Sequence, residues 1–155
     1  LIEDVSPFDL SDGDAQYINK FRPNSYYDFV HSSQCLEHMK DVNVAILNWF
    51  KLVKPDGYMV ITIPDEDLYE QGVWPSRWNH DHKWTFSIYK SISWSPVHIN
   101  VLDLVKSLGV SCEPIRLNLI DTNYNYSLMG KGIDQTRSND GVEAFIELVV
   151  KKKFT

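Results

Sequence analysis

The stretch YYDFVHSSQCLEHMKDVNVAILNWFKLVKPDGYMVITIP, residues 26–64, decides the fold class. Residues 26–31 predict a short strand, and the β-branched run 58–63 predicts a second strand that is apolar on both faces. Between them, apolar residues recur at three- and four-residue spacing over 42–53, and Asp41 precedes them as a suitable N-cap. Strand, helix and strand in this order form a βαβ unit, so the sequence predicts an α/β fold.

The rest of the chain extends this unit into one domain over residues 1–155. The segment 65–95 has no clean period and holds most of the tryptophans, which indicates an inserted lid or substrate wall. A second helix is expected over 96–108, where Gly109 would end it. Two late strands, near 113–120 and 144–152, predict a long hairpin at the far edge of the sheet.

Composition excludes several classes of partner and setting. The formal net charge of −6 disfavours non-specific binding to nucleic acid or to anionic membrane. Cys35 and Cys112 are the only cysteines, so neither a disulfide framework nor a zinc cluster of cysteines is indicated. No apolar run approaches the roughly 20 residues of a membrane span. We therefore expect a cytoplasmic protein that binds neither nucleic acid nor membrane.

The polar stretch after the first strand predicts where a ligand binds. His31, Ser32 and Ser33 follow the apolar run, and open α/β sheets bind ligands at the carboxyl ends of parallel strands. Ser32 or Cys35 could act as a nucleophile, but the chain has no strained elbow of the GxSxG kind. The triplet His80-Asp81-His82 suggests a metal, yet three neighbouring residues seldom converge on one ion, so no metal site is expected.

Five motifs follow one another in the sequence: Gly13-Asp14-Ala15-Gln16, Tyr27-Asp28-Phe29-Val30-His31-Ser32-Ser33, Leu36-Glu37-His38, Lys54-Pro55-Asp56-Gly57-Tyr58 and Ile63-Pro64-Asp65. In this order and spacing they resemble the class I S-adenosylmethionine-dependent methyltransferases, in the middle and C-terminal portions of that fold. The family pattern runs from an acidic-Ala pair through a strand opening with Asp, a Leu-Glu-His stretch, a helix and a Lys-Pro-Gly-Gly-type turn to a second strand.

The resemblance implies an incomplete Rossmann-like sheet, mostly parallel with a C-terminal antiparallel hairpin, and helices on both faces. It also implies S-adenosylmethionine as the cofactor. Asp14 would accept a hydrogen bond from the adenine amino group, while the Ala15 N–H faces a ring nitrogen; as an alternative, Asp14 belongs to a plain turn. His31, Ser32 and Ser33 would lie near the methionine part of the cofactor.

Methyl transfer requires in-line positioning and, for a hydroxyl acceptor, removal of a proton. The candidates for the proton acceptor are His38, Asp65 and His82, with His80 as a further choice. Glu37 and His38 could instead be structural. The acidic, aromatic lid favours a small-molecule or sugar acceptor.

One motif of the family is missing. The glycine-rich loop after the family's first strand should precede Asp14, but Gly13 is the only glycine before Gly57. We therefore expect an N-terminally truncated domain that binds the cofactor weakly, or else a non-catalytic binding or assembly module. A third alternative, a nucleotide-binding enzyme such as a dehydrogenase, is disfavoured because the glycine-rich dinucleotide-binding motif is missing as well. The strand at 26–31 would also form an unpaired sheet edge, which predicts a homodimer through that edge or a cover formed by Leu1–Leu10.

Overall fold

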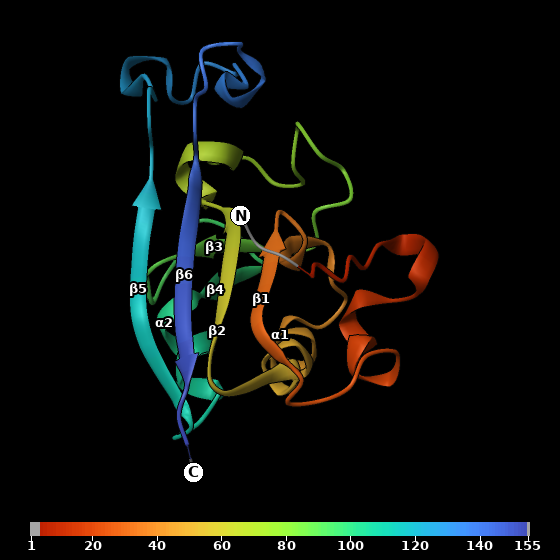
Figure 1. Ribbon diagram of the computed structural model, residues 1–155. Helices are drawn as coiled ribbons and strands as arrows, with labels where there is room; N and C mark the ends of the chain where they lie inside the picture. The colour runs from red at the N-terminus through yellow and green to blue at the C-terminus, as the bar shows by residue number, and fades with distance from the viewer. Residues whose placement is uncertain (1–3, 155) are drawn as a thin grey trace.

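The computed structural model describes residues 4–154 and contains a four-stranded sheet in the order β1-β2-β6-β5 (Figure 1). β1 pairs in parallel with β2, and β6 pairs antiparallel with both β2 and β5. Three strands therefore run in one direction and β6 alone is reversed, which confirms the α/β class, the mostly parallel sheet and the C-terminal antiparallel hairpin. The bounds are Tyr27–Ser33 for β1, Val53–Pro64 for β2, Cys112–Ile120 for β5 and Phe145–Lys152 for β6.

The predicted first helix is α1, Val42–Leu52, between β1 and β2. Asp41 begins it as expected, since its side chain accepts a hydrogen bond from the Val44 N–H at 3.0 Å. The turn after the helix depends on Gly57, where a Cβ would lie 2.8 Å from the Asp28 carbonyl oxygen. Only glycine lets the two strands approach so closely at this point.

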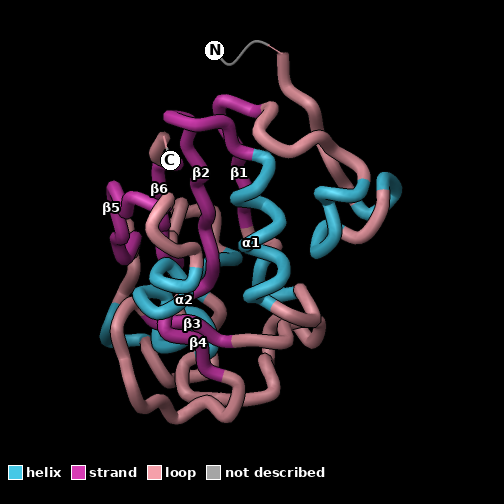
Figure 2. The backbone as a smooth tube through the Cα atoms, turned by 90° about the horizontal axis from the view of Figure 1, so that it is seen from below, coloured by secondary structure: helices cyan, strands magenta, loops and turns pink. Residues whose placement is uncertain are grey.

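The core lies on one face of the sheet. In β2, Met59, Ile61 and Ile63 are fully buried, and each pairs with a buried aliphatic residue of β6. The same cluster includes the apolar faces of α1 and of the second helix, α2 (Val101–Ser107), and Figure 2 shows both helices on one side of the sheet. The expectation of helices on both faces is therefore wrong for α1 and α2, because every fully buried position of β2 and β6 faces the same way.

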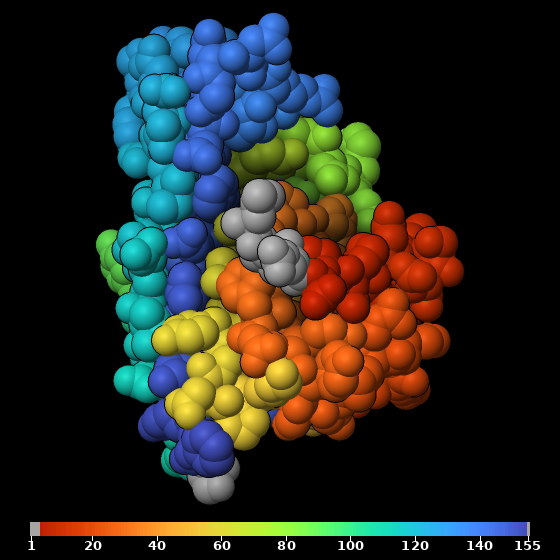
Figure 3. All heavy atoms as spheres, viewed as in Figure 1, coloured from red at the N-terminus to blue at the C-terminus, as the bar shows by residue number. Residues whose placement is uncertain are grey.

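The opposite face carries side chains that stay partly exposed, and it is called the open face below. It includes Phe29 of β1 and Tyr58 of β2, which are paired in register and 41% and 40% exposed. Figure 3 shows atoms of all four strands at the surface on this face. β1 pairs only with β2 among the described residues, so the predicted sheet edge is confirmed. Residues 4–10 contain no strand, while residues 1–3 of the predicted cover lie outside the described chain.

The second predicted helix is shorter than the pattern 96–108 suggested. Residues His98–Asn100 form strand β4, which pairs in parallel with β3 (Thr85–Ser87) in a separate two-stranded sheet. Asn100 then begins α2, because its side chain accepts a hydrogen bond from the Asp103 N–H at 3.3 Å. The pairing of β4 with β3 thus replaces the predicted helix over 98–100, and α2 begins only after the Asn100 cap.

Segment 65–95 is an ordered part of the fold. Its anchor is Glu66, which is fully buried and accepts four side-chain hydrogen bonds. Although burial alone would raise it, these bonds hold the pKa of Glu66 below its ordinary value. The four donors are Thr85 at 3.0 Å, Lys90 at 3.0 Å, Ser93 at 2.8 Å and His98 at 2.9 Å.

Short helical turns connect these elements, and several of them lie where a strand ends. The turns are η1 (Leu10–Asp12), η2 (Ala15–Lys20), η3 (Leu36–His38), η4 (Glu66–Glu70), η5 (Tyr126–Leu128) and η6 (Gln135–Arg137).

Among residues 4–154 no helix is long and apolar enough to cross a bilayer.

Candidate functional site

The three residues that end β1 divide between the two faces of the sheet. Ser32 lies beside Ile61 on the helix-covered face, and its Oγ is buried with no hydrogen-bond partner among the described residues. His31 and Ser33 point to the open face, where His31 stacks on Phe29 at 6.1 Å and Ser33 accepts a hydrogen bond from Thr62 at 2.9 Å. The expected group is therefore adjacent in sequence but does not form one cluster.

Asp14 and Ala15 lie where η2 packs against α1. The Asp14 side chain accepts a hydrogen bond from the Gln16 N–H at 2.9 Å, as an N-cap does. The Ala15 carbonyl accepts a hydrogen bond from the indole N–H of Trp49 at 2.8 Å. Asp14 therefore does belong to a turn, as the alternative prediction stated. The two hydrogen bonds fix the Asp14-Ala15 pair at the edge of the domain.

Segment 65–95 crosses η3 and brings His82 next to Glu37 and His38. The Lys83 N–H donates to the Glu37 carbonyl at 2.8 Å, and the Trp84 indole N–H donates to the Met39 carbonyl at 2.8 Å. These two bonds fix the chain against the end of η3. Two of the three predicted proton acceptors, 44 positions apart, therefore share one site.

The imidazoles of this site are arranged in the same way. His38 Nε2 lies 3.8 Å and His82 Nε2 lies 4.0 Å from the same oxygen of Glu37, Oε1. The opposite nitrogen of each ring faces another carboxylate: His38 Nδ1 lies 3.0 Å from Asp81, and His82 Nδ1 lies 2.7 Å from Glu70. In each histidine, Nδ1 therefore lies next to one carboxylate, of Asp81 or Glu70, and Nε2 points toward Glu37.

Glu37 is the centre of the site, and its side chain is only 1% exposed. Neither carboxylate oxygen of Glu37 has a hydrogen-bond partner among the described residues, and the same holds for Oε2 of the buried Glu70. Burial raises the pKa of Glu37 to about 7. The sequence predicts at most a structural role for Glu37 and no role for Glu70, because nothing in their spacing links them to His82.

Asp65 follows β2 at the same carboxyl edge of the sheet, but its contacts are those of a helix cap. Its Oδ1 accepts hydrogen bonds from the N–H groups of Asp67 and Leu68 at 3.0 and 3.1 Å, which begins η4. Burial raises the pKa of Asp65 to about 6. Its role as a proton acceptor stays a prediction.

The three side chains of the triplet 80–82 point to different places. His80 is exposed, Asp81 contacts His38, and His82 turns inward. Cys35, the other reactive candidate, is half-buried, and burial raises the pKa of its thiol, which disfavours a nucleophilic thiolate.

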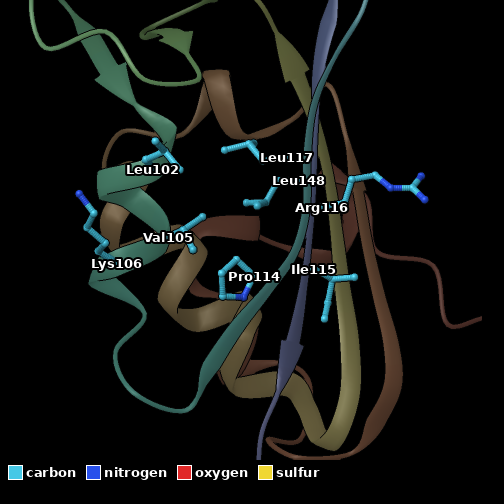
Figure 4. A pocket seen from close by; sticks show the side chains of 8 residues that line it. All are labelled: Leu102, Val105, Lys106, Pro114, Ile115, Arg116, Leu117 and Leu148. Carbon is cyan, nitrogen blue, oxygen red and sulfur yellow. The ribbon is translucent and has the colours of Figure 1, made fainter.

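Two shallow pockets lie away from these side chains. One, of about 310 Å³, separates α2 from the sheet; Figure 4 shows Leu102 and Val105 facing Leu117 and Leu148, whereas Arg116 points to the other side. The second, of about 420 Å³, joins segment 65–95 to the loop after β5. Its lining residues are Asp67, Gln71, Gly72, Met129 and Gly130.

Solved structures share this fold at low identity. An S-adenosylmethionine-dependent methyltransferase from Archaeoglobus fulgidus aligns over 90% of this chain and 66% of its own, with 19% identity and a TM-score of 0.53. One from Thermotoga maritima aligns over 91% and 62%, with 16% identity and a TM-score of 0.56. The cyclase SpnF aligns over 92% and 56%, with 14% identity and a TM-score of 0.54. The chain thus spans 56–66% of the length of these structures.

The family model of the methyltransferase domain matches residues 3–108, a range that includes β1, α1, β2 and the whole Glu37 site. No curated protein sequence matches the chain. The family match covers more than half of the chain, and it agrees with the motifs on which the sequence prediction rested. The chain therefore belongs to the methyltransferase domain family, within the class I S-adenosylmethionine-dependent fold.

Proposed function

We propose that this chain takes part in methyl transfer from S-adenosylmethionine to a hydroxyl group of a small molecule or sugar. The observation that carries the proposal is the group of polar residues at the carboxyl edge of β1 and β2, inside the region that matches the family. Ligands of open α/β sheets bind at this edge. When bound, the cofactor supplies the methyl group, and the chain positions the acceptor.

The described residues fit one part of the cofactor. Ser32 offers a buried hydroxyl with no partner among residues 4–154, as a contact for the methionine part would require. Asp14 and Ala15 offer an acceptor and a donor for adenine. A glycine-rich loop does not occur before Asp14 in this sequence, so we propose that the chain alone binds the cofactor weakly.

At the acceptor side, the Glu37 site is better suited than Asp65 to contact a hydroxyl group. Asp65 already accepts two backbone hydrogen bonds, whereas His38 is partly exposed and directs a ring nitrogen inward. A sugar hydroxyl is a weak acid and needs such a group to hold it or to take its proton.

We expect S-adenosylhomocysteine to bind this chain in the millimolar rather than the micromolar range. In a titration of ¹⁵N-labelled protein followed by amide chemical shifts, the affected amides should include Ala15, Ser32 and Ser33. Methyl glycosides, titrated separately, should shift the amides around His38 and His82. Ser32→Val removes the buried hydroxyl and should weaken the binding of S-adenosylhomocysteine but not that of the methyl glycosides. The matched change Ser107→Val on α2 should weaken the binding of neither ligand. Micromolar binding, or shifts spread away from these residues, would contradict the proposal.

A non-catalytic assembly module is the second candidate, and the open face favours it. An edge strand with apolar side chains on an uncovered face is prone to pair with another chain. We therefore propose a homodimer that uses the edge and open face of β1, where Phe29 is 41% exposed.

Sedimentation velocity is expected to show a dimer for the unaltered chain and a monomer for Phe29→Glu, because a charge at this position opposes burial of the open face. Tyr89→Glu is the matched control, since Tyr89 is 74% exposed and lies outside the four-stranded sheet. It should remain a dimer. A monomeric unaltered chain at every concentration measured would rule out this interface.

A further inference from the structure

We propose that Glu37, His38 and His82 form a binding site for one divalent transition-metal cation of the zinc type. Each residue offers one ligand atom, and these three atoms lie within 4.8 Å of one another. The ligand set, two imidazoles and one carboxylate, is one that catalytic zinc sites use, and it leaves a further position for water or an acceptor oxygen.

The distances require only a small closure of the site. Three ligands of a tetrahedral zinc ion at about 2.0–2.2 Å lie about 3.4 Å from one another. His38 Nε2 and His82 Nε2 are 3.8 and 4.0 Å from Glu37 Oε1. All three ligand atoms lie within 4.8 Å of one another, so rotations of the side chains have to bring them closer by at most about 1.4 Å to bind one ion.

The residues behind the ligands have the arrangement that metal sites use. A metal-bound histidine almost always donates its second ring N–H to a carboxylate or carbonyl, which fixes the tautomer that leaves the other nitrogen free for the metal. Here both histidines meet this condition: Asp81 lies 3.0 Å from His38 Nδ1, and Glu70 lies 2.7 Å from His82 Nδ1.

Burial gives an independent argument for a cation. Three carboxylate oxygens, two of Glu37 and one of Glu70, are buried and have no hydrogen-bond partner among residues 4–154. A buried carboxylate without a partner is destabilising, and buried charges are normally paired or bound to metal. A cation of charge 2+ at this site gives Glu37 the partner that it lacks, and its charge also offsets that of Glu70 behind His82.

Zinc binding by the tag-free, chelator-treated chain is the direct test. Calorimetry is expected to show one Zn²⁺ per chain, and Co²⁺ in its place should give the intense visible absorption of a tetrahedral site. Glu37→Gln removes a ligand while keeping the side-chain shape, and it should weaken binding by more than about 100-fold and abolish the cobalt bands. Glu70→Gln, which affects only the support of His82, should weaken binding by about 10–100-fold.

His80→Gln is the matched control, because His80 belongs to the same triplet but is exposed and outside the three ligands. It should bind zinc like the unaltered chain. Absence of saturable one-to-one uptake would overturn the proposal, as would an equal loss in His80→Gln and His82→Gln. The inference rests on the proposed function, because it places a cation where the methyl acceptor would bind. Calorimetry and cobalt absorption, however, measure metal binding without any methyl transfer. Zinc binding without methyl transfer, or the reverse, therefore separates the two proposals.

Discussion

Replacement of Glu66 by alanine is expected to lower the free energy of unfolding by about 3–5 kcal/mol, measured by urea unfolding followed by tryptophan fluorescence. Glu66 is fully buried and accepts hydrogen bonds from four side chains. The truncation removes the acceptor of the Thr85 hydroxyl and of His98 Nδ1, whereas Lys90 keeps Asp67 as a partner. A buried donor without an acceptor costs far more than the bond itself contributes.

Two further variants separate this network from an ordinary ion pair. Glu66→Gln keeps the shape and part of the hydrogen bonding, so it should cost about 1–3 kcal/mol. Asp103→Ala breaks the solvent-exposed pair with Lys106 on α2 and should cost less than about 1 kcal/mol. If Glu66→Ala were no more destabilising than Asp103→Ala, segment 65–95 would not depend on this anchor.

Replacement of Trp49 by alanine is expected to cost about 3–5 kcal/mol of stability, in the same range as other buried aromatic truncations. Trp49 is only 3% exposed, and its side chain belongs to the core on the helix-covered face. Its indole N–H also holds the Ala15 carbonyl at 2.8 Å. The change should therefore loosen η2 together with the core, which amide exchange at residues 15–20 can follow during the same denaturation series.

Trp49→Phe distinguishes these two contributions. Phenylalanine retains most of the apolar packing but donates no hydrogen bond, so faster exchange at residues 15–20 is expected with a smaller loss of stability, about 1–3 kcal/mol. Trp94→Ala is the control, because Trp94 is 38% exposed. Equal effects of Trp49→Ala and Trp94→Ala would show that the indole of Trp49 does not support η2.

The central part of the fold could be predicted from sequence because local signals agree there. In residues 26–64 the helical spacing, the Asp41 cap and the β-branched run at 58–63 all favour the same βαβ unit, and the structure follows them closely. The pattern failed at 96–100, where an apolar period continued across a pairing of β3 with β4. That pairing is a contact with a strand ten or more positions away, which a local window does not contain.

The candidate site shows the same limit more strongly. Its strand-end serines and His38 could be placed at the carboxyl edge, since that edge follows from the βαβ unit itself. The convergence of Glu37 with His82 could not, because it depends on the course of segment 65–95 across η3 through backbone and indole hydrogen bonds. The triplet 80–82 does contain one residue of the site, His82, but its partner Glu37 is far away in the sequence.

The position of β6 has a consequence for how the chain acquires its structure during synthesis. β6 lies between β2 and β5, yet it is translated after both of them. Until residues 145–152 leave the ribosome, β2 can pair only with β1. The edges of β2 and β5 that later pair with β6 then expose unpaired backbone N–H and C=O groups, to which other chains can bind. The four-stranded sheet can therefore form only after β6 has been synthesised and has inserted between β2 and β5. We expect the nascent chain to be most prone to misassociation just before this insertion.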